Sequence, residues 1–494
     1  MSALQPATCH LQHVPSNLHP FILQSWLMKL SFHGAAHCVT GSKHLIKLKN
    51  GQQLLLDCGL FQGMGKDTDD LNRDFGFEPS EVTVMVLSHA HMDHSGLIPK
   101  LCKEGFTGKI FCTPATKQLT NVLLQDSGHI QEEDIRFTNK RRAAQGLPYL
   151  KPLYTIEDAR TAISQFETKE YGIWFKVLEN VECMFTDAGH IIGSEVVNLR
   201  IVEDGKTTAI TFSGDVGRYR DIILKSPEVF PQADVIIMES TYGDSLHEMN
   251  LTTPDLLLGW IEKTCIQKKG NLIMPAFSVG RTQELLYALN QLELENRLPA
   301  LEYFVDSPLS IQATAVIKSF PKYFNKAFQK VLEVDDDPFA FKGLKFISTV
   351  EQSKQLNFKQ EPFVVISASG MAEAGRVKHH ISNNIENDRN TILLTGYCEP
   401  NSLGGRLMAG EKEVSIFGLR HQVHAEIGSI RSMSAHGDYE DLSQWLSCQD
   451  PRKVKKLFIV HGDYNVQQVF KQRLLKKEFF DVEIPAMHSE FGIG

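Results

Sequence analysis

Long apolar runs and paired cysteines, which mark membrane proteins and disulfide-rich secreted proteins, are both missing from this sequence of 494 residues. No stretch approaches the roughly 18 consecutive apolar residues of a membrane span. The nine cysteines are scattered, odd in number and contain no C-x-x-C pair, which argues against a disulfide framework and a cysteine zinc site. The first 27 residues lack the basic and apolar segments of a secretory signal. We therefore expect a cytoplasmic protein with no membrane partner.

A net positive charge is also missing. The formal net charge of −8 is not typical of a protein that binds nucleic acid with its whole surface. Three local basic groups occur nevertheless: Arg136 with Lys140, Arg141 and Arg142; residues 452–456; and residues 471–477. Because runs of charge usually form solvated faces, these groups do not by themselves predict a ligand.

The length predicts two structural units, because one hydrophobic core rarely serves so long a chain. A regular pattern begins at Met28, so residues 1–27 are expected to be an N-terminal extension. Residues 28–242 contain short apolar strands, a hairpin around Asn50-Gly51, and few long helices, the main one at 116–125. Residues 243–432 alternate strands and helices, which is typical of a parallel sheet. Residues 433–494 return to the first unit, so the second α/β domain is predicted to be inserted within the first.

The densest cluster of functional residue types is segment 88–96, which puts three imidazoles and a carboxylate directly after the apolar strand 82–87. Histidines beside an aspartate would have to be desolvated together, and a shared cation offsets that cost. Alternate residues of an extended turn point the same way, so His89 and His91 are predicted to bind one metal ion. Asp93 and His94 would then reach a second ion. A polar loop of unpaired histidines is the alternative, and the density of ligand-type residues argues against it.

Three later turns carry further ligand-type residues, and each again follows a strand. They are His190 after strand 181–185, Asp215 after strand 208–212, and His461 after strand 457–460. A single His or Asp at a strand end is usually a capping or surface residue. Four strand ends that present such residues at one edge of a sheet predict a single site instead.

Taken in order, these motifs resemble the metallo-β-lactamase superfamily, and more narrowly its β-CASP branch of nucleases. The superfamily elements are matched by Asp57, the His89-x-His91-x-Asp93-His94 segment, His190 and Asp215; the branch motifs are matched by Glu239, His436 and His461; and segments 275–281 and 367–376 resemble the inserted domain of that branch. The branch includes bacterial and archaeal ribonucleases and the endonuclease subunit of the pre-mRNA cleavage and polyadenylation factor. The resemblance implies an α/β fold, namely a metallo-β-lactamase αββα sandwich with an inserted parallel-sheet β-CASP domain.

The resemblance also implies two zinc ions per chain. His89, His91 and His190 would bind one ion; Asp93, His94 and His461 would bind the other; and Asp215 would bridge them. Asp57 would orient a ligand imidazole, although a polar residue at a strand end is the alternative for it. The implied catalytic residues are Asp93, His436 and Glu239. Among these, His436 would protonate the departing 3′ oxygen, and Glu239 would hold the His436 ring in orientation.

The implied function is a zinc-dependent ribonuclease that hydrolyses phosphodiester bonds of single-stranded RNA and leaves 5′-phosphate and 3′-hydroxyl ends. Endonuclease action is expected, and 5′-to-3′ exonuclease action stays open. His461 favours RNA, because histidine at this motif is typical of the RNA enzymes of the branch and valine of its DNA-repair members. A DNA nuclease, a small-molecule metallo-hydrolase and an inactive RNA-binding subunit are the alternatives. RNA is the expected partner, and a homodimer stays open.

Four residues of the inserted domain are predicted to bind substrate. Arg281 and Arg376 each stand near the start of a predicted helix, and Ser369 and Gly370 lie in a serine-glycine turn. Guanidinium and backbone N–H groups of this kind can bind phosphate. A turn-forming or surface role is the alternative for each of them.

Overall fold

Strands with apolar residues on their inward faces build two seven-stranded sheets that pack face to face. The computed structural model describes residues 27–247, 253–396, 398–430 and 433–493. The predicted N-terminal extension, residues 1–27, therefore lies outside the described residues except for Leu27. Among the described residues, no helix combines the length and apolar content that crossing a bilayer requires.

The first sheet joins the two ends of the described chain. Its strands, in spatial order, are β22 (Glu490–Ile493), β1 (Met28–Phe32), β2 (His44–Lys47), β3 (Gln53–Leu56), β4 (Val84–Val86), β5 (Ile110–Cys112) and β6 (Phe166–Thr168). Strands β2 and β3 form the hairpin predicted around Asn50-Gly51. From β3 to β6 all neighbours are parallel, so the carboxyl ends of these strands lie along one edge.

The second sheet is antiparallel on one side and parallel on the other. Its order is β21 (Val482–Glu483), β20 (Lys456–Ile459), β11 (Val235–Met238), β10 (Lys206–Phe212), β9 (Glu195–Glu203), β8 (Val181–Asp187) and β7 (Phe175–Leu178). Buried residues from both sheets, including Phe32, Leu54, Phe185 and Phe458, form one core between them. Burial of such side chains contributes about 25 cal/mol per Å² of apolar surface.

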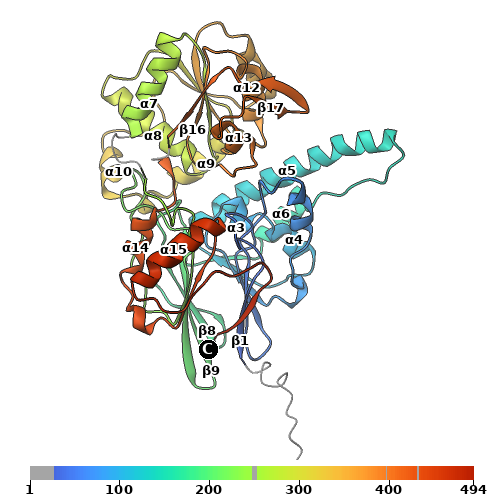
Figure 1. The fold of residues 1–494 in the computed structure, drawn as a ribbon, viewed down its shortest axis with the longest axis vertical. Helices are drawn as coiled ribbons and strands as arrows, with labels where there is room; N and C mark the ends of the chain where they lie inside the picture. Colours follow the sequence, from blue (N-terminus) through green and yellow to red (C-terminus); the bar gives the residue numbers. More distant parts are fainter. Residues whose placement is uncertain (1–26, 248–252, 397, 431–432, 494) are drawn as a thin grey trace, which may run out of the picture.

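Helices cover the outer face of each sheet. The first sheet is covered by α4 (Ile98–Lys103), α6 (Ile156–Ile163) and the start of α5 (Pro114–Ala144); the second is covered by α14 (Tyr439–Leu446) and α15 (Tyr464–Lys476). Smaller pieces of the sandwich are η2 (Gly65–Asp67), α2 (Thr68–Arg73), η3 (Pro79–Glu81), α3 (Met92–Ser95) and η8 (Pro451–Lys453). This is the predicted αββα sandwich (Figure 1).

The inserted domain contains a six-stranded sheet whose neighbours are all parallel, as predicted. Its order is β14 (Leu344–Phe346), β13 (Glu302–Val305), β15 (Phe363–Ser367), β12 (Leu272–Pro275), β16 (Thr391–Leu394) and β19 (Glu426–Ser429). One face packs on α7 (Thr253–Ile261), α8 (Arg281–Leu294) and α9 (Pro308–Lys318); the other packs on α12 (Arg376–Asn384) and α13 (Leu403–Met408). The remaining elements are η4 (Glu262–Gln267), η5 (Pro321–Tyr323), α10 (Lys326–Val331), α11 (Val350–Gln355), η6 (Leu356–Phe358) and the hairpin β17 (Glu413–Ile416) with β18 (Leu419–Gln422).

The two domains share a hydrophobic cluster. Ala90 and Ile191, from the turns that carry the predicted ligands, belong to the same buried cluster as Ala276 and Val279 of the inserted domain. The inserted domain therefore packs directly against the edge of the sandwich where the predicted site lies (Figure 1).

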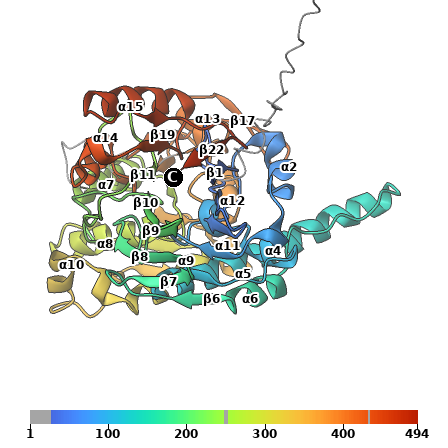
Figure 2. The same cartoon turned by 90° about the horizontal axis from the view of Figure 1, so that it is seen from below.

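Helix α5 is much longer than the sequence pattern indicated. The prediction ended at residue 125, where the apolar spacing stops, but the helix has 31 residues and continues to Ala144. The extra turns include Gln, Glu, Lys, Arg and Ala residues, which favour helix without needing a buried face. Figure 2 shows this part of α5 extending away from the rest of the molecule.

Candidate metal centre

Six turns that follow strands of the sandwich meet at the edge beside the inserted domain. Asp57 follows β3, His89 to His94 follow β4, His190 follows β8, Asp215 follows β10, Glu239 follows β11 and His461 follows β20. Their strands run in the same direction within each sheet, so their carboxyl ends converge. The fold thereby brings residues that are far apart in the sequence into one site.

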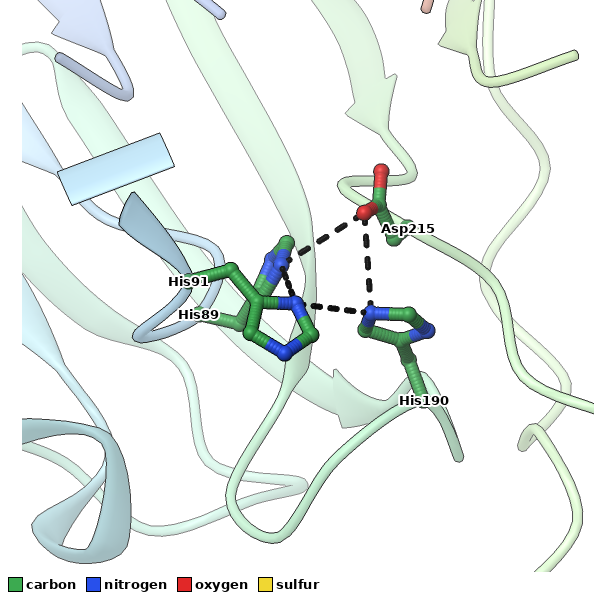
Figure 3. Close-up of side chains that lie close together, drawn as sticks. All are labelled: His89, His91, His190 and Asp215. Atoms are coloured by element: carbon green, nitrogen blue, oxygen red, sulfur yellow. Dashed lines mark hydrogen bonds and ion pairs between the residues drawn. The ribbon is translucent and has the colours of Figure 1, made fainter. Parts of the chain in front are cut away.

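The first ligand group consists of His89, His91, His190 and Asp215 (Figure 3). His91 Nδ1 lies 3.2 Å from His89 Nε2 and 3.1 Å from His190 Nε2. The Oδ2 atom of Asp215 lies 3.5 Å from His89 Nε2 and 3.6 Å from His190 Nε2. Four ligand atoms thus point toward a common point from three separate turns.

The second ligand group consists of Asp93, His94 and His461. His94 Nε2 lies 3.3 Å from His461 Nε2, which lies 3.4 Å from Asp93 Oδ2. Asp215 Oδ2 lies 3.3 Å from His94 Nε2, so this carboxylate stands between the two groups. The arrangement places Asp215 where a bridging ligand would have to be.

The protonation states favour ligands for a cation. Burial, together with the neighbouring imidazoles, holds the pKa of His89 and His190 well below the usual value, so both rings are neutral. Burial opposes ionisation of Asp93 and Asp215. The hydrogen bond from His461 nevertheless lowers the pKa of Asp93 to about 2, and the charges of His461 and His94 lower that of Asp215. Neutral imidazoles and ionised carboxylates are the metal-binding forms of these side chains. Burial opposes the charge of His94, but the carboxylates of Asp215 and Asp57 raise its pKa well above the usual value, so a cation bound there would displace a proton.

The donor set fits divalent metal ions. Asp215 Oδ1 is buried and makes no hydrogen bond within the described residues. A buried polar atom of that kind is costly unless another group compensates it. Imidazole nitrogens and carboxylate oxygens without a thiolate suit zinc and other first-row divalent ions. The two groups together would hold two ions that share Asp215.

Two residues orient the ligands of the second group. Asp57 accepts a hydrogen bond from the Ser88 N–H (2.7 Å), and its other oxygen lies 2.6 Å from His94 Nδ1. Thr241 Oγ1 lies 3.1 Å from His461 Nδ1. The sequence prediction included Asp57 but missed Thr241, although Thr241 stands two residues after Glu239 in the same strand-end turn. Such contacts fix the ring that a ligand presents to the metal.

His436 lies beside both groups and is held by Glu239. Its Nδ1 lies 3.1 Å from Glu239 Oε1, and the same oxygen accepts a hydrogen bond from the Val216 N–H at 2.7 Å. Burial of the His436 ring opposes its charge, but the carboxylates of Glu239 and Asp215 outweigh burial and raise the pKa to about 9. A protonated imidazole at this place can donate a proton near neutral pH.

The four predicted substrate-binding residues lie in the inserted domain, and the structure places them differently from one another. Arg281 is buried and forms an ion pair with Glu284. Arg376 Nη1 lies 2.6 Å from Asp306 Oδ1. Each guanidinium is therefore already paired with a carboxylate of its own domain.

The serine-glycine turn lies near a ligand through the Phe277 ring. Ser369 is half-buried, and its hydroxyl donates to the Ala374 carbonyl at 3.3 Å. Gly370 packs on the Phe277 ring so closely that a Cβ atom would lie 2.6 Å from it, and the centroid of that ring is 6.4 Å from that of His91. Phosphate binding by any of the four residues stays a prediction.

Comparisons with known proteins agree with this geometry. Three family models match successive parts of the chain: the metallo-beta-lactamase superfamily at residues 42–260, the Beta-Casp domain at 282–407, and a Zn-dependent metallo-hydrolase RNA specificity domain at 420–485. The chain is also 33% identical to ribonuclease TTHA0252 of Thermus thermophilus, over 88% of this chain and 93% of that protein. The chain belongs to the β-CASP family of the metallo-β-lactamase superfamily. The family predicted from the motifs is therefore confirmed.

Other β-CASP relatives are longer than this chain. It is 27% identical to transcription termination factor FttA of Methanosarcina mazei over 83% of this chain, and 26% identical to cleavage and polyadenylation specificity factor 73 of Drosophila melanogaster over 92%. It spans 63% and 62% of the lengths of these two proteins. A crystal structure of a protein of unknown function from Enterococcus faecalis shares the fold, with a TM-score of 0.51 at 11% identity, covering 94% of this chain and 100% of that one.

Proposed function

We propose that this β-CASP protein is a zinc-dependent ribonuclease that hydrolyses phosphodiester bonds in single-stranded RNA. The observation that carries the proposal is the position of Asp215 between two ligand groups, with His436 and Glu239 at their side. Metal ligands alone would serve any hydrolase of this superfamily, because function depends on the site and not on the fold. Cleavage of a phosphodiester also needs a proton for the leaving oxygen, and His436 lies beside the two metal sites, where it could supply one.

The metal pair would supply Lewis acidity for the phosphoryl oxygens and increase the acidity of the attacking water. His89, His91 and His190 would hold one ion, and Asp93, His94 and His461 the other, with Asp215 shared. The Asp93 side chain is 22% exposed, against 1% for Asp215, so its carboxylate can also accept a hydrogen bond from the attacking water.

His436 would protonate the leaving oxygen. As the water oxygen bonds to phosphorus and the bond from phosphorus to the 3′ oxygen breaks, the departing oxygen needs a proton. His436 would donate it, and Glu239 would stabilise the ring in its charged form and fix its orientation. The products would carry a 5′-phosphate and a 3′-hydroxyl.

Two features favour RNA over DNA. The family model that covers residues 420–485 is described as an RNA specificity domain, and several relatives are named for ribonuclease or RNA-processing roles. His461, the residue that led to the RNA prediction, occupies the second ligand group. A DNA nuclease of the same family is the second candidate, because the metal chemistry would be identical.

The test is cleavage of matched RNA and DNA oligonucleotides of one sequence by zinc-loaded protein. We expect RNA to be cleaved much faster, with 5′-phosphate ends on the products. Circular RNA that is cut shows endonuclease action, and 5′-labelled linear RNA shows whether digestion also runs from the 5′ end. The Asp215→Asn variant is the control for contaminating nuclease. Equal cleavage of RNA and DNA would overturn the substrate assignment, and no cleavage of either would overturn the assignment as a nuclease.

A further inference from the structure

The end of helix α5 that extends from the molecule has no role in the metal centre. We define the arm as residues 129–151, which comprise the helix after Gly128 and the segment that returns along it. The buried residues of α5 end at Gly128, and no residue of the arm is buried. At about 1.5 Å per residue the whole helix is about 46 Å long. Figures 1 and 2 both show the arm standing clear of the two domains.

The arm is an ordered element and not a loose loop. The Asn139 side chain donates to the Leu150 carbonyl at 2.9 Å and accepts from the Leu150 N–H at 2.8 Å. Arg142 Nε donates to the Pro148 carbonyl at 2.7 Å, and the Gln131 side chain accepts from the Leu153 N–H at 3.1 Å. The returning segment is therefore fastened to the helix at three successive levels.

The outer part of the arm carries a net positive charge. Residues 136–151 contain five basic residues and no acidic one: Arg136, Lys140, Arg141, Arg142 and Lys151. Arg136 forms an ion pair with Glu133. Lys140, Arg141 and Lys151 form no ion pair with any described residue, and all three are exposed. A protein with a net charge of −8 thus concentrates unpaired cations on one projecting element.

Exposed rings stand among these cations. Tyr149 is 71% exposed and Phe137 is 58% exposed. Lys140 Nζ lies 5.6 Å from the centre of the Phe137 ring. Tyr149 stands between Pro148 and Leu150, whose backbones are hydrogen-bonded to the helix turn that carries Lys140 and Arg141. Aromatic faces that stack with bases, together with cations that contact phosphates, are the usual surface for single-stranded nucleic acid.

The base of the helix connects the arm to the metal centre. Ala115 and Leu119 belong to the same buried cluster as Ala90 and Ile191, which flank the metal ligands. Thr113 and Thr116 both donate to the Gly193 carbonyl, at 2.7 and 2.8 Å, in the turn that carries His190. The arm is thus fixed to the loops that would hold the metal ions.

From these features we propose that the arm binds single-stranded RNA outside the catalytic site, holding the part of a long strand that extends beyond the scissile phosphate. The proposal rests on the proposed ribonuclease function. A second copy of the chain fits the arm less well, because an isologous contact between two arms would bring like charges together. RNA instead supplies phosphates for the cations and bases for the rings.

The test compares RNA binding by three variants in the His436→Ala background, where cleavage is slowed enough to measure binding. Lys140→Gln/Arg141→Gln removes two unpaired cations while keeping helix propensity, and Tyr149→Ala removes the more exposed of the two rings of the arm. Lys47→Gln/Lys206→Gln is the matched control, because these exposed lysines lie on β2 and β10 and form no ion pair with any described residue. Affinities are measured by fluorescence anisotropy at several salt concentrations, with unstructured RNAs of about 6 and about 30 nucleotides, of which only the second exceeds the usual site size.

For the long RNA, we expect the double arm variant to lower the slope of log affinity against log salt by about 1.4, since each phosphate contact on a single strand contributes about 0.7. Tyr149→Ala should weaken long-RNA binding by about fivefold or more. Binding of the short RNA should not change, and the control should match the parent with both RNAs.

Two results would overturn the proposal for the arm. One is long-RNA affinity and salt slope that are the same in the arm variants and the control. The other is an arm variant that changes only sedimentation, from dimer to monomer, which would make the arm a contact between copies. Normal cleavage of the short RNA by the protein that retains His436, together with arm variants that do not change long-RNA binding, would reject the arm and leave the ribonuclease intact. Failure of the His436→Ala parent protein to bind either RNA would reject both the arm proposal and the proposed ribonuclease function.

Discussion

The site contains two carboxylate–imidazole pairs, Asp57–His94 and Glu239–His436, that differ in what surrounds the ring. His94 Nδ1 lies 2.6 Å from Asp57, and its Nε2 faces Asp215 and His461 at 3.3 Å each. His436 Nδ1 lies 3.1 Å from Glu239, and its side chain remains 17% exposed. The first ring is enclosed by other ligands, and the second remains partly exposed.

This difference shows how one chemical pair can serve two purposes. A carboxylate behind a ring whose far nitrogen meets other ligand atoms strengthens a metal ligand. The same carboxylate behind a ring that faces substrate stabilises a proton donor. Variants of the two pairs should therefore have different effects. Changes in Asp57–His94 should lower the metal content, and changes in Glu239–His436 should slow protonation of the leaving group.

The largest effect is expected where both ligand groups meet. Asp215→Asn removes the charge that faces His89, His190 and His94, so both sites should weaken together. We expect a fall in both metal content and activity that exceeds the about 10² to 10⁴ ascribed to a positioned acid. Metal analysis and RNA cleavage measure this, with Asp204→Asn on the exposed surface as the matched control. Normal metal content in the variant would exclude a bridging role.

The next largest effect is expected for the Glu239–His436 pair. His436→Ala should reduce the rate by about 10² to 10⁴ and keep the metal content of the parent, because the ring is assigned to proton donation. His379→Ala, which changes an exposed histidine of the inserted domain, is the control. Since His436 also lies within ligand distance of Asp215 and His461, loss of metal from His436→Ala would make it a ligand and break the comparison.

A change in the Asp57–His94 pair should lower the affinity for metal. Asp57→Asn keeps the shape of the side chain but weakens its support of His94, so affinity for the second ion should fall by about 10- to 100-fold. Competition with a chelator of known affinity measures this. Ser42→Ala is the control, because it removes only the 3.2 Å hydrogen bond that Asp57 accepts from Ser42. An unchanged affinity in Asp57→Asn would mean that the carboxylate only stabilises the turn.

The smallest effect is a change in pH dependence. His436 must be protonated to donate, so activity is lost as pH rises through its pKa. Burial of the ring lowers this pKa, and the Glu239 carboxylate makes the largest contribution that raises it, to about 9. Glu239→Gln should therefore move the alkaline loss of activity to lower pH while the metal content stays the same. A pH profile with the same alkaline limb in both proteins would contradict the proposed role of Glu239.

Part of the fold and of the site could be predicted from the sequence alone. Strands that alternate with helices predicted the inserted parallel sheet, and the strand ends predicted which residues would meet. Thr241 was missed because its role depends on the rotation of the His461 ring, which only tertiary contacts determine. The partners of Arg281 and Arg376 were missed for a similar reason, since neither carboxylate could be matched to its guanidinium from the sequence alone.

The length of α5 could not be predicted from apolar spacing. Helix prediction by periodicity needs a buried face, and the arm has none. Residues after Gly128 remain helical through local propensity and through hydrogen bonds to the returning segment, such as those between Asn139 and Leu150. The part of the chain that packing does not explain is also the part whose charge and exposed rings suggest a separate task.

The most direct test of the account is the zinc content of the purified protein after zinc is supplied and excess metal is removed. Two ligand groups that share Asp215 predict two zinc ions per chain. His436→Ala should also contain two, and His461→Ala should lose one. A single ion per chain in the parent protein, or none, would contradict the binuclear centre on which the proposed chemistry depends.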